Sequence, residues 1–103
     1  MRVNFKKKFK NFKGEDVDQY ICDVVAESLF NAGVSEQLKV DDADKFKAYA
    51  ISQKLIVGDG VVDITTEEAT LIKDLCMHCL TAGAYGQLYE IIEQLNSDKD
   101  ETY

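Results

Sequence analysis

The sequence predicts a mainly α-helical protein with a small β element (α+β): about four helices and a short N-terminal strand or hairpin. Three observations support this fold class. The chain of 103 residues contains no proline, which suits long helices because proline interrupts helical hydrogen bonding. Apolar residues recur at helical spacing in four segments that have recognisable starts and stops. Two short stretches, "RVNF" and "VVDI", have the composition of strands.

The first fourteen residues, "MRVNFKKKFKNFKG", fit two secondary structures. As a strand, they place Val3, Phe5, Lys7 and Phe9 on one face. As a helix, Phe5, Phe9 and Phe12 follow the spacing i, i+4, i+7. We favour a short strand followed by a turn, because no helix-capping residue precedes "RVNF".

Two helices are expected next. The first lies within "DVDQYICDVVAESLFNAG", with Asp16 or Asp18 as its N-cap and Gly33 just past its end. The second lies within "DDADKFKAYAISQKLIV", capped by Asp41 or Asp42 and ended by "GDG". Its expected buried face consists of Ala43, Phe46, Ala50 and Leu55 with Tyr49 and Ile56.

The second half of the chain has the clearest local signals. Residues 61–64, "VVDI", form either an extended link or a strand that pairs with "RVNF". Thr65 and Glu68 form a capping box that starts a helix over about 66–80. Thr81 caps a fourth helix, in which Gly83 and Gly86 either admit another backbone or mark an irregular first turn. We expect residues 1–96 to form one domain and residues 97–103 to be a disordered tail.

The sequence "LCMHCL" raises the question of a metal site. On a helix, Cys76 and Cys79 both fall at the centre of the apolar face, with His78 at its margin. A structural zinc site needs four ligands, and only Cys22 remains elsewhere. The favoured interpretation is buried structural cysteines with no metal and no cofactor. The alternative is a site made by Cys22, Cys76, His78 and Cys79 with a carboxylate.

The charges are divided unevenly along the chain, whose net charge is −7. Six of the twelve basic residues lie in the first thirteen positions, and all nineteen acidic residues lie from Glu15 onward. This basic end is the candidate contact for a protein partner or an anion. It comprises Arg2, Lys6, Lys7, Lys8, Lys10 and Lys13.

Several partners fit a basic end with interleaved phenylalanines. It would bind nucleic acid through phosphates and stacked bases, an anionic membrane surface, or the acidic body of another copy. In the plainest alternative, the phenylalanines are core and the lysines form a solvated outer face. The chain has no apolar run of the ~20 residues needed to span a bilayer. It also has no phosphate-binding glycine loop and no catalytic motif, so we expect no enzyme.

The C-terminal half resembles a known group of proteins. "VDITTEEATLIKDL" followed by "AYGQLYEIIEQL" is similar to patterns in a loose group of small phage and prophage proteins. "CMHC" and the concentrated lysines depart from that pattern. The resemblance implies a phage-encoded accessory protein in the cytoplasm of a bacterial host. The three cysteines lack the spacing of a disulfide framework, which fits a reducing compartment of this kind. We expect it to act by binding a host or phage protein, or itself, as an inhibitor or assembly factor.

Overall fold

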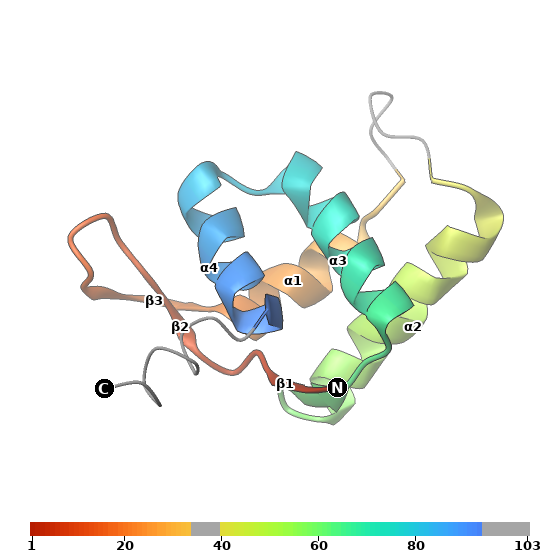
Figure 1. Ribbon diagram of the computed structural model, residues 1–103, viewed down its shortest axis with the longest axis horizontal. Coiled ribbons are helices and arrows are strands. Elements are labelled where there is room, and N and C mark those ends of the chain that lie inside the picture. The colour runs from red at the N-terminus through yellow and green to blue at the C-terminus, as the bar shows by residue number, and fades with distance from the viewer. Residues whose placement is uncertain (34–39, 94–103) are drawn as a thin grey trace.

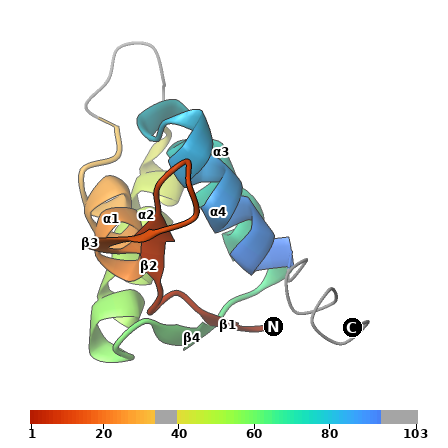
Figure 2. The same cartoon turned by 90° about the vertical axis from the view of Figure 1, so that its left-hand side faces the viewer.

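An N-terminal segment with two short strands runs along a group of four helices (Figures 1 and 2). The computed structural model describes residues 1–33 and 40–93. The predicted fold class, mainly α with a small N-terminal β element, is confirmed. The predicted tail, 97–103, lies outside the described residues. In chain order the elements are β1 Arg2–Asn4, β2 Lys8–Lys10, β3 Asp16–Tyr20, α1 Ile21–Phe30, α2 Asp42–Val57, β4 Val61–Asp63, α3 Thr66–Cys79 and α4 Ala82–Glu93.

The strands form two separate antiparallel pairs. β1 pairs with β4, with Val3 opposite Val62, so the predicted pairing between "RVNF" and residues 61–64 is confirmed. β2 and β3 form a hairpin whose register is irregular between Lys8 and Lys10. In both N-terminal strands the central residue is buried and its neighbours are exposed. The helical alternative for this segment, with Phe5, Phe9 and Phe12 on one stripe, is therefore wrong.

The first helix begins later than predicted. Residues Asp16–Tyr20 form β3, and α1 starts at Ile21 without a side-chain cap. The expected caps, Asp16 and Asp18, instead belong to the hairpin. The N–H of Ile21 donates to the carbonyl of Lys7 at 2.8 Å, and the N–H of Cys22 donates to that of Phe5 at 2.9 Å. Carbonyl groups from a distant segment thus replace the local cap.

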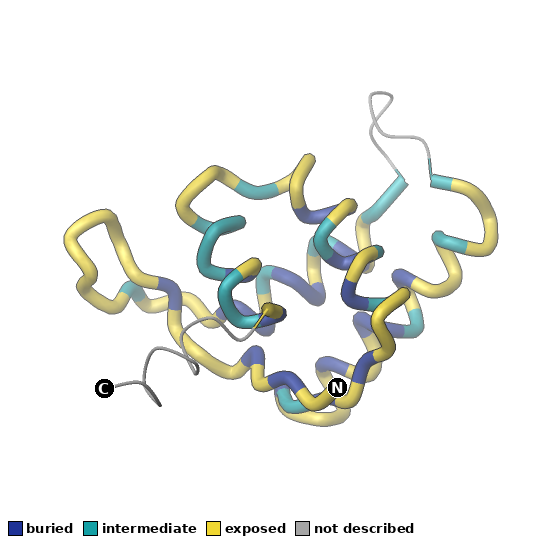
Figure 3. Tube along the Cα trace, in the orientation of Figure 1, coloured by how far each residue is buried: buried dark blue, intermediate teal, exposed yellow. Residues whose placement is uncertain are grey.

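The buried face of α2 also differs from the prediction. Asp41 caps the helix as expected, accepting from the N–H of Asp44 at 2.8 Å. The predicted face is largely wrong, because Leu55 alone of its six members is fully buried, whereas Phe46, Tyr49 and Ile56 are exposed. The residues of α2 that enter the core are Ala48, Ile51, Ser52 and Leu55 (Figure 3).

One hydrophobic core joins residues from both sheets and all four helices. Its largest fully buried side chain is Phe5, which follows β1. The helices contribute most of the rest, including Val25, Leu29, Ile72 and Leu88. Burying an apolar side chain of this size stabilises the fold by roughly 1.5–3 kcal/mol.

The last two helices begin as the sequence predicts. The capping box of α3 is complete: Thr65 Oγ1 accepts from the N–H of Glu68 at 3.0 Å, and Glu68 Oε1 accepts from the N–H of Thr65 at 2.9 Å. Thr81 Oγ1 accepts from the N–H of Ala84 at 3.3 Å at the start of α4. α4 is helical from Ala82, and a Cβ at Gly83 or Gly86 would meet no atom within 4 Å. Both interpretations of these two glycines are therefore wrong within the described residues.

Gly86 and Gly60 provide a matched pair of alanine substitutions with opposite expected effects. We expect Gly86→Ala to raise the free energy of unfolding by about 0.5–1 kcal/mol, because glycine costs helix-interior stability and the site is open. We expect Gly60→Ala to lower it by at least about 1 kcal/mol, since Gly60 has φ +90° and its Cβ would lie 2.9 Å from the Lys6 nitrogen. Urea unfolding of both variants measures the difference. Equal effects of the two substitutions would contradict the described geometry.

Candidate functional site: a basic groove beside the hairpin

A groove of about 760 Å³ lies between the β2–β3 hairpin and α4. Figure 2 looks onto the hairpin, with α4 beside it. Four of the six predicted cationic residues line the groove: Arg2, Lys7, Lys8 and Lys10. Exposed aromatic side chains, Phe12 and Tyr20, add apolar surface, while Asp16 and Glu90 are the two acidic members. The structure therefore brings most of the predicted contact residues to one place.

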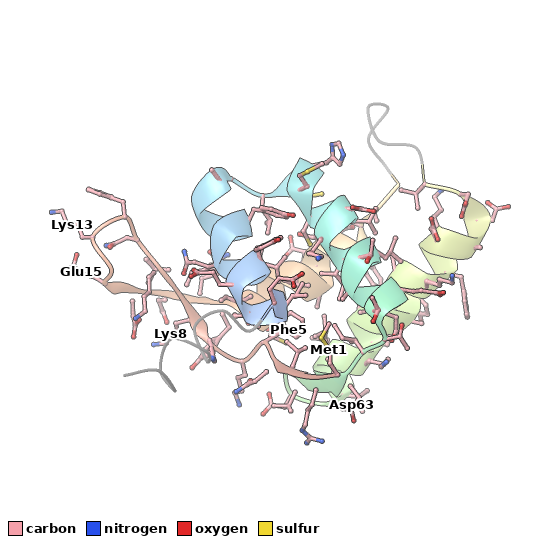
Figure 4. All side chains as sticks on the ribbon, in the orientation of Figure 1. Met1, Phe5, Lys8, Lys13, Glu15 and Asp63 are labelled. Atoms are coloured by element: carbon pink, nitrogen blue, oxygen red, sulfur yellow. The ribbon has the colours of Figure 1, made fainter. Side chains whose placement is uncertain are left out.

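The other two predicted cations lie apart from this lining. Lys6 donates to Asp59 Oδ2 at 2.6 Å, across to the turn between α2 and β4. Lys13 lies at the tip of the hairpin next to Glu15 (Figure 4), and its ammonium is 5.7 Å from the Phe12 ring centroid. Neither residue lines the groove.

Acidic residues of the same chain pair with much of the basic end. Lys10 donates to Asp16 Oδ1 at 2.8 Å, and Lys8 lies 4.0 Å from Asp18 Oδ1. Arg2 lies 3.9 Å from Asp63 Oδ2. The uneven division of charge along the sequence is thus partly neutralised by folding. Within residues 1–33 and 40–93, Lys7 is a groove cation with no carboxylate in ion-pair range.

Two ion pairs of the basic end each shift the pKa of one member. The hydrogen bond from Lys10, and then its charge, hold the pKa of Asp16 below its ordinary value. The hydrogen bond to Asp59, and then its charge, raise the pKa of Lys6. Both pairs are exposed, so salt screens them and they contribute little to stability. The effect of these two ion pairs is local, because each holds a lysine ammonium group next to a carboxylate.

Gln87 of α4 hydrogen-bonds to part of the outer edge of β2, the edge that does not pair with β3. Its Oε1 accepts from the N–H of Lys10 at 2.7 Å, and its Nε2 donates to the Lys10 carbonyl at 2.9 Å. The side-chain amide therefore bonds to Lys10 as a residue of a neighbouring strand would. The sheet is two-stranded over the described ranges, so no third strand covers this edge. Lys8, at the other end of β2, also lines the groove. Sequence reasoning missed Gln87, because no local pattern marks a helix residue that reaches a strand edge.

The phenylalanines of the basic end are mostly core. Phe5 and Phe9 are buried, whereas Phe12 is 94% exposed. The alternative in which the phenylalanines are core and the lysines lie outside is correct for Phe5 and Phe9. Two of the three rings expected to stack on bases are therefore inaccessible.

The cysteines do not form the predicted buried pair. Cys76 is buried, but Cys79 is exposed because it is the last residue of α3 and the chain turns away after it. His78 is also exposed. Over the described part of the chain, no three His, Cys, Asp or Glu side chains gather where they could hold a metal ion. The alternative set of Cys22, Cys76, His78 and Cys79 is thus not brought together.

Burial disfavours the charged, reactive form of two of the thiols, Cys22 and Cys76. It raises the pKa of Cys76 to about 12, and the neighbouring Cys79 adds to the shift. Burial also raises the pKa of Cys22, whose Sγ lies 3.8 Å from the Leu55 carbonyl oxygen. Because the thiolate is the nucleophile, burial disfavours reaction at both thiols.

No family model, curated protein or solved structure matches this chain. Among the helices of residues 1–33 and 40–93, none is long and apolar enough to cross a membrane.

The burial of the thiols predicts selective labelling. In the native protein a maleimide should modify Cys79 rapidly and Cys22 and Cys76 only as the protein unfolds. Mass spectrometry should find one adduct in buffer and three in denaturant. Cys79→Ser should abolish the rapid adduct. Rapid native labelling of Cys76 would contradict its place in the core.

The contact between Gln87 and Lys10 predicts a local change in amide exchange. In Gln87→Ala the Lys10 N–H loses its acceptor, a change of roughly 1 kcal/mol, and should exchange about fivefold faster. Two-dimensional NMR of hydrogen exchange measures this rate. Gln53→Ala, at an exposed position of α2, is the matched control and should leave Lys10 unchanged. Equal Lys10 rates in both variants would rule out the edge contact.

Proposed function

We propose that this chain is a non-enzymatic phage or prophage accessory protein that binds another protein in the cytoplasm of a bacterial host. The resemblance of "VDITTEEATLIKDL" and "AYGQLYEIIEQL" to small phage proteins supports the phage origin. The observation that carries the binding role is the basic groove along the outer edge of β2. Whether the gene lies among early or virion-assembly genes distinguishes a host-factor inhibitor from an assembly factor.

The groove favours an acidic segment of a partner in extended conformation. An extended peptide adds to a sheet edge through main-chain hydrogen bonds, and side-chain pockets select its sequence. Here Lys7 and Lys8 provide positive charge at the edge, and Phe12 and Tyr20 provide apolar contacts. Lys8 is weakly held, since its nearest carboxylate is 4.0 Å away, so it can pair with a partner's carboxylate at little cost.

Nucleic acid is the second candidate, favoured by the same cations and by the exposed ring of Phe12. The burial of Phe5 and Phe9 leaves it fewer stacking surfaces than the sequence suggested. A protein segment therefore fits the groove better.

A fluorescent peptide of alternating glutamate and valine tests the proposal by anisotropy. We expect it to bind, and a lysine–valine peptide not to bind. Lys7→Glu should weaken binding about fivefold, because reversing one exposed charge contact costs roughly 1 kcal/mol. Lys47→Glu makes the same charge change on exposed α2, away from the groove lining, and is the control.

The outcomes separate the two candidates. Loss of affinity in Lys7→Glu but not in Lys47→Glu supports the groove. No binding of the acidic peptide, or equal loss in both variants, contradicts it. A single-stranded oligonucleotide that binds more tightly than the peptide, with affinity falling steeply as salt rises, would favour nucleic acid instead.

A further inference from the structure

α2 has a second apolar face that points away from the core. Phe46 is 70% exposed, Tyr49 48% and Ile56 57%. Phe46, Tyr49, Gln53 and Ile56 are spaced by three, four and three residues, which is the spacing of the contact positions in paired helices. A helix that is apolar on two faces is typical of one covered on both. Within residues 1–33 and 40–93, only the face with Ile51 and Leu55 is covered.

The exposed face continues onto α1. The ring of Phe30, 59% exposed, lies 6.0 Å from that of Tyr49, and Phe46 lies 6.4 Å from Tyr49, centroid to centroid. A groove of about 260 Å³ between the helices extends the surface to Ile56. With rings that each contribute ~150–250 Å², the surface is on the order of 500 Å², more than half of one side of a stable interface. We call it the α1–α2 patch: Phe30, Phe46, Tyr49, Gln53 and Ile56.

The patch has opposite charges at its two ends. At one end the stem of Lys45 occupies the space where a Cβ of Gly33 would stand. At the other end Asp23 and Glu27 border the groove beside Ile56. Within the described ranges, Lys45 has no carboxylate in ion-pair range. A partner that pairs with both ends must place an acidic group next to Lys45 and a basic group next to Asp23 and Glu27.

The four patch positions of α2 are spaced symmetrically about the level of Ile51. Phe46 and Ile56 lie equally far from it along the helix, and so do Tyr49 and Gln53. An antiparallel second copy of α2 would therefore place Phe46 opposite Ile56, and Tyr49 opposite Gln53. The same rotation brings Lys45 of one chain to the acidic end of the other. This self-complementarity is what a two-fold interface requires.

We propose that a second copy of this chain covers the α1–α2 patch, forming a two-fold symmetric dimer with antiparallel α2 helices. The aromatic rings form the apolar centre of the interface. Gln53 is the polar contact position that fixes the register. Lys45 pairs with Glu27 of the second copy at both ends, outside the apolar centre, as rim charges do.

Sedimentation and light scattering test the dimer, with matched phenylalanine substitutions. The wild-type chain should be dimeric. Phe46→Glu should weaken association at least about thirtyfold by placing a charge in the apolar centre, while circular dichroism shows the native fold. Phe12→Glu, at a position 94% exposed in the hairpin turn, should remain dimeric. Phe46→Glu should still bind the acidic peptide, because its β2 edge is intact, and this result separates the proposal from the groove.

A charge exchange identifies a second copy as the occupant. Lys45→Glu alone and Glu27→Lys alone should each weaken dimerisation, because each homodimer has two pairs of like charges. An equimolar mixture of the two variants should recover a heterodimer, since each interface pair is then opposite in sign. A wild-type chain that is monomeric up to about 1 mM, a dimeric Phe46→Glu variant, or a mixture that does not associate would each overturn the proposal.

Discussion

The backbone of Phe5 and Lys7 holds the first helix and both sheets in place. Their carbonyls accept from the first two N–H groups of α1, which are unpaired within any helix. The N–H of Phe5 donates to the carbonyl of Gly60 at 2.7 Å, next to β4. The Phe5 ring is fully buried. One residue thus fixes the start of α1, the turn before β4 and the centre of the core.

This long-range cap also positions the groove. Because α1 begins at Ile21, the preceding residues Asp16–Tyr20 are extended and pair with β2. The hairpin is then held against α4 through Gln87. Had Asp16 or Asp18 capped a longer helix, as local sequence rules favour, β2 would lack its partner strand. The groove therefore results from a tertiary contact that overrides a local preference.

The sequence predicted the parts of the fold that depend on neighbours in the chain. The capping box at Thr65, the cap at Asp41 and the strand "RVNF" are local patterns, and the structure contains them. The start of α1 depends on carbonyl groups of a distant segment, and the exposure of Cys79 follows from the end of α3 at that residue. Both predictions were wrong. For the candidate site, the concentration of basic residues near the N-terminus was enough to predict the cations of the groove. Their pairing with Asp16 and Asp59, and the role of Gln87, arise only when separate segments meet.

The error at α2 has a physical cause of its own. Apolar residues lie on two faces of α2. Helical periodicity therefore predicted the face with Phe46, Tyr49 and Ile56 as buried, although Ala48, Ile51 and Leu55 enter the core. A helix that is apolar on two faces is typically covered on both, and the described residues of the chain cover one. Figure 1 places the hairpin and α2 at opposite ends of the molecule, so a partner on one surface does not block the other. Were a second copy to cover the α1–α2 patch, the dimer would present two basic grooves. Two-site binding to one partner would then be tighter than either groove alone, through effective concentration.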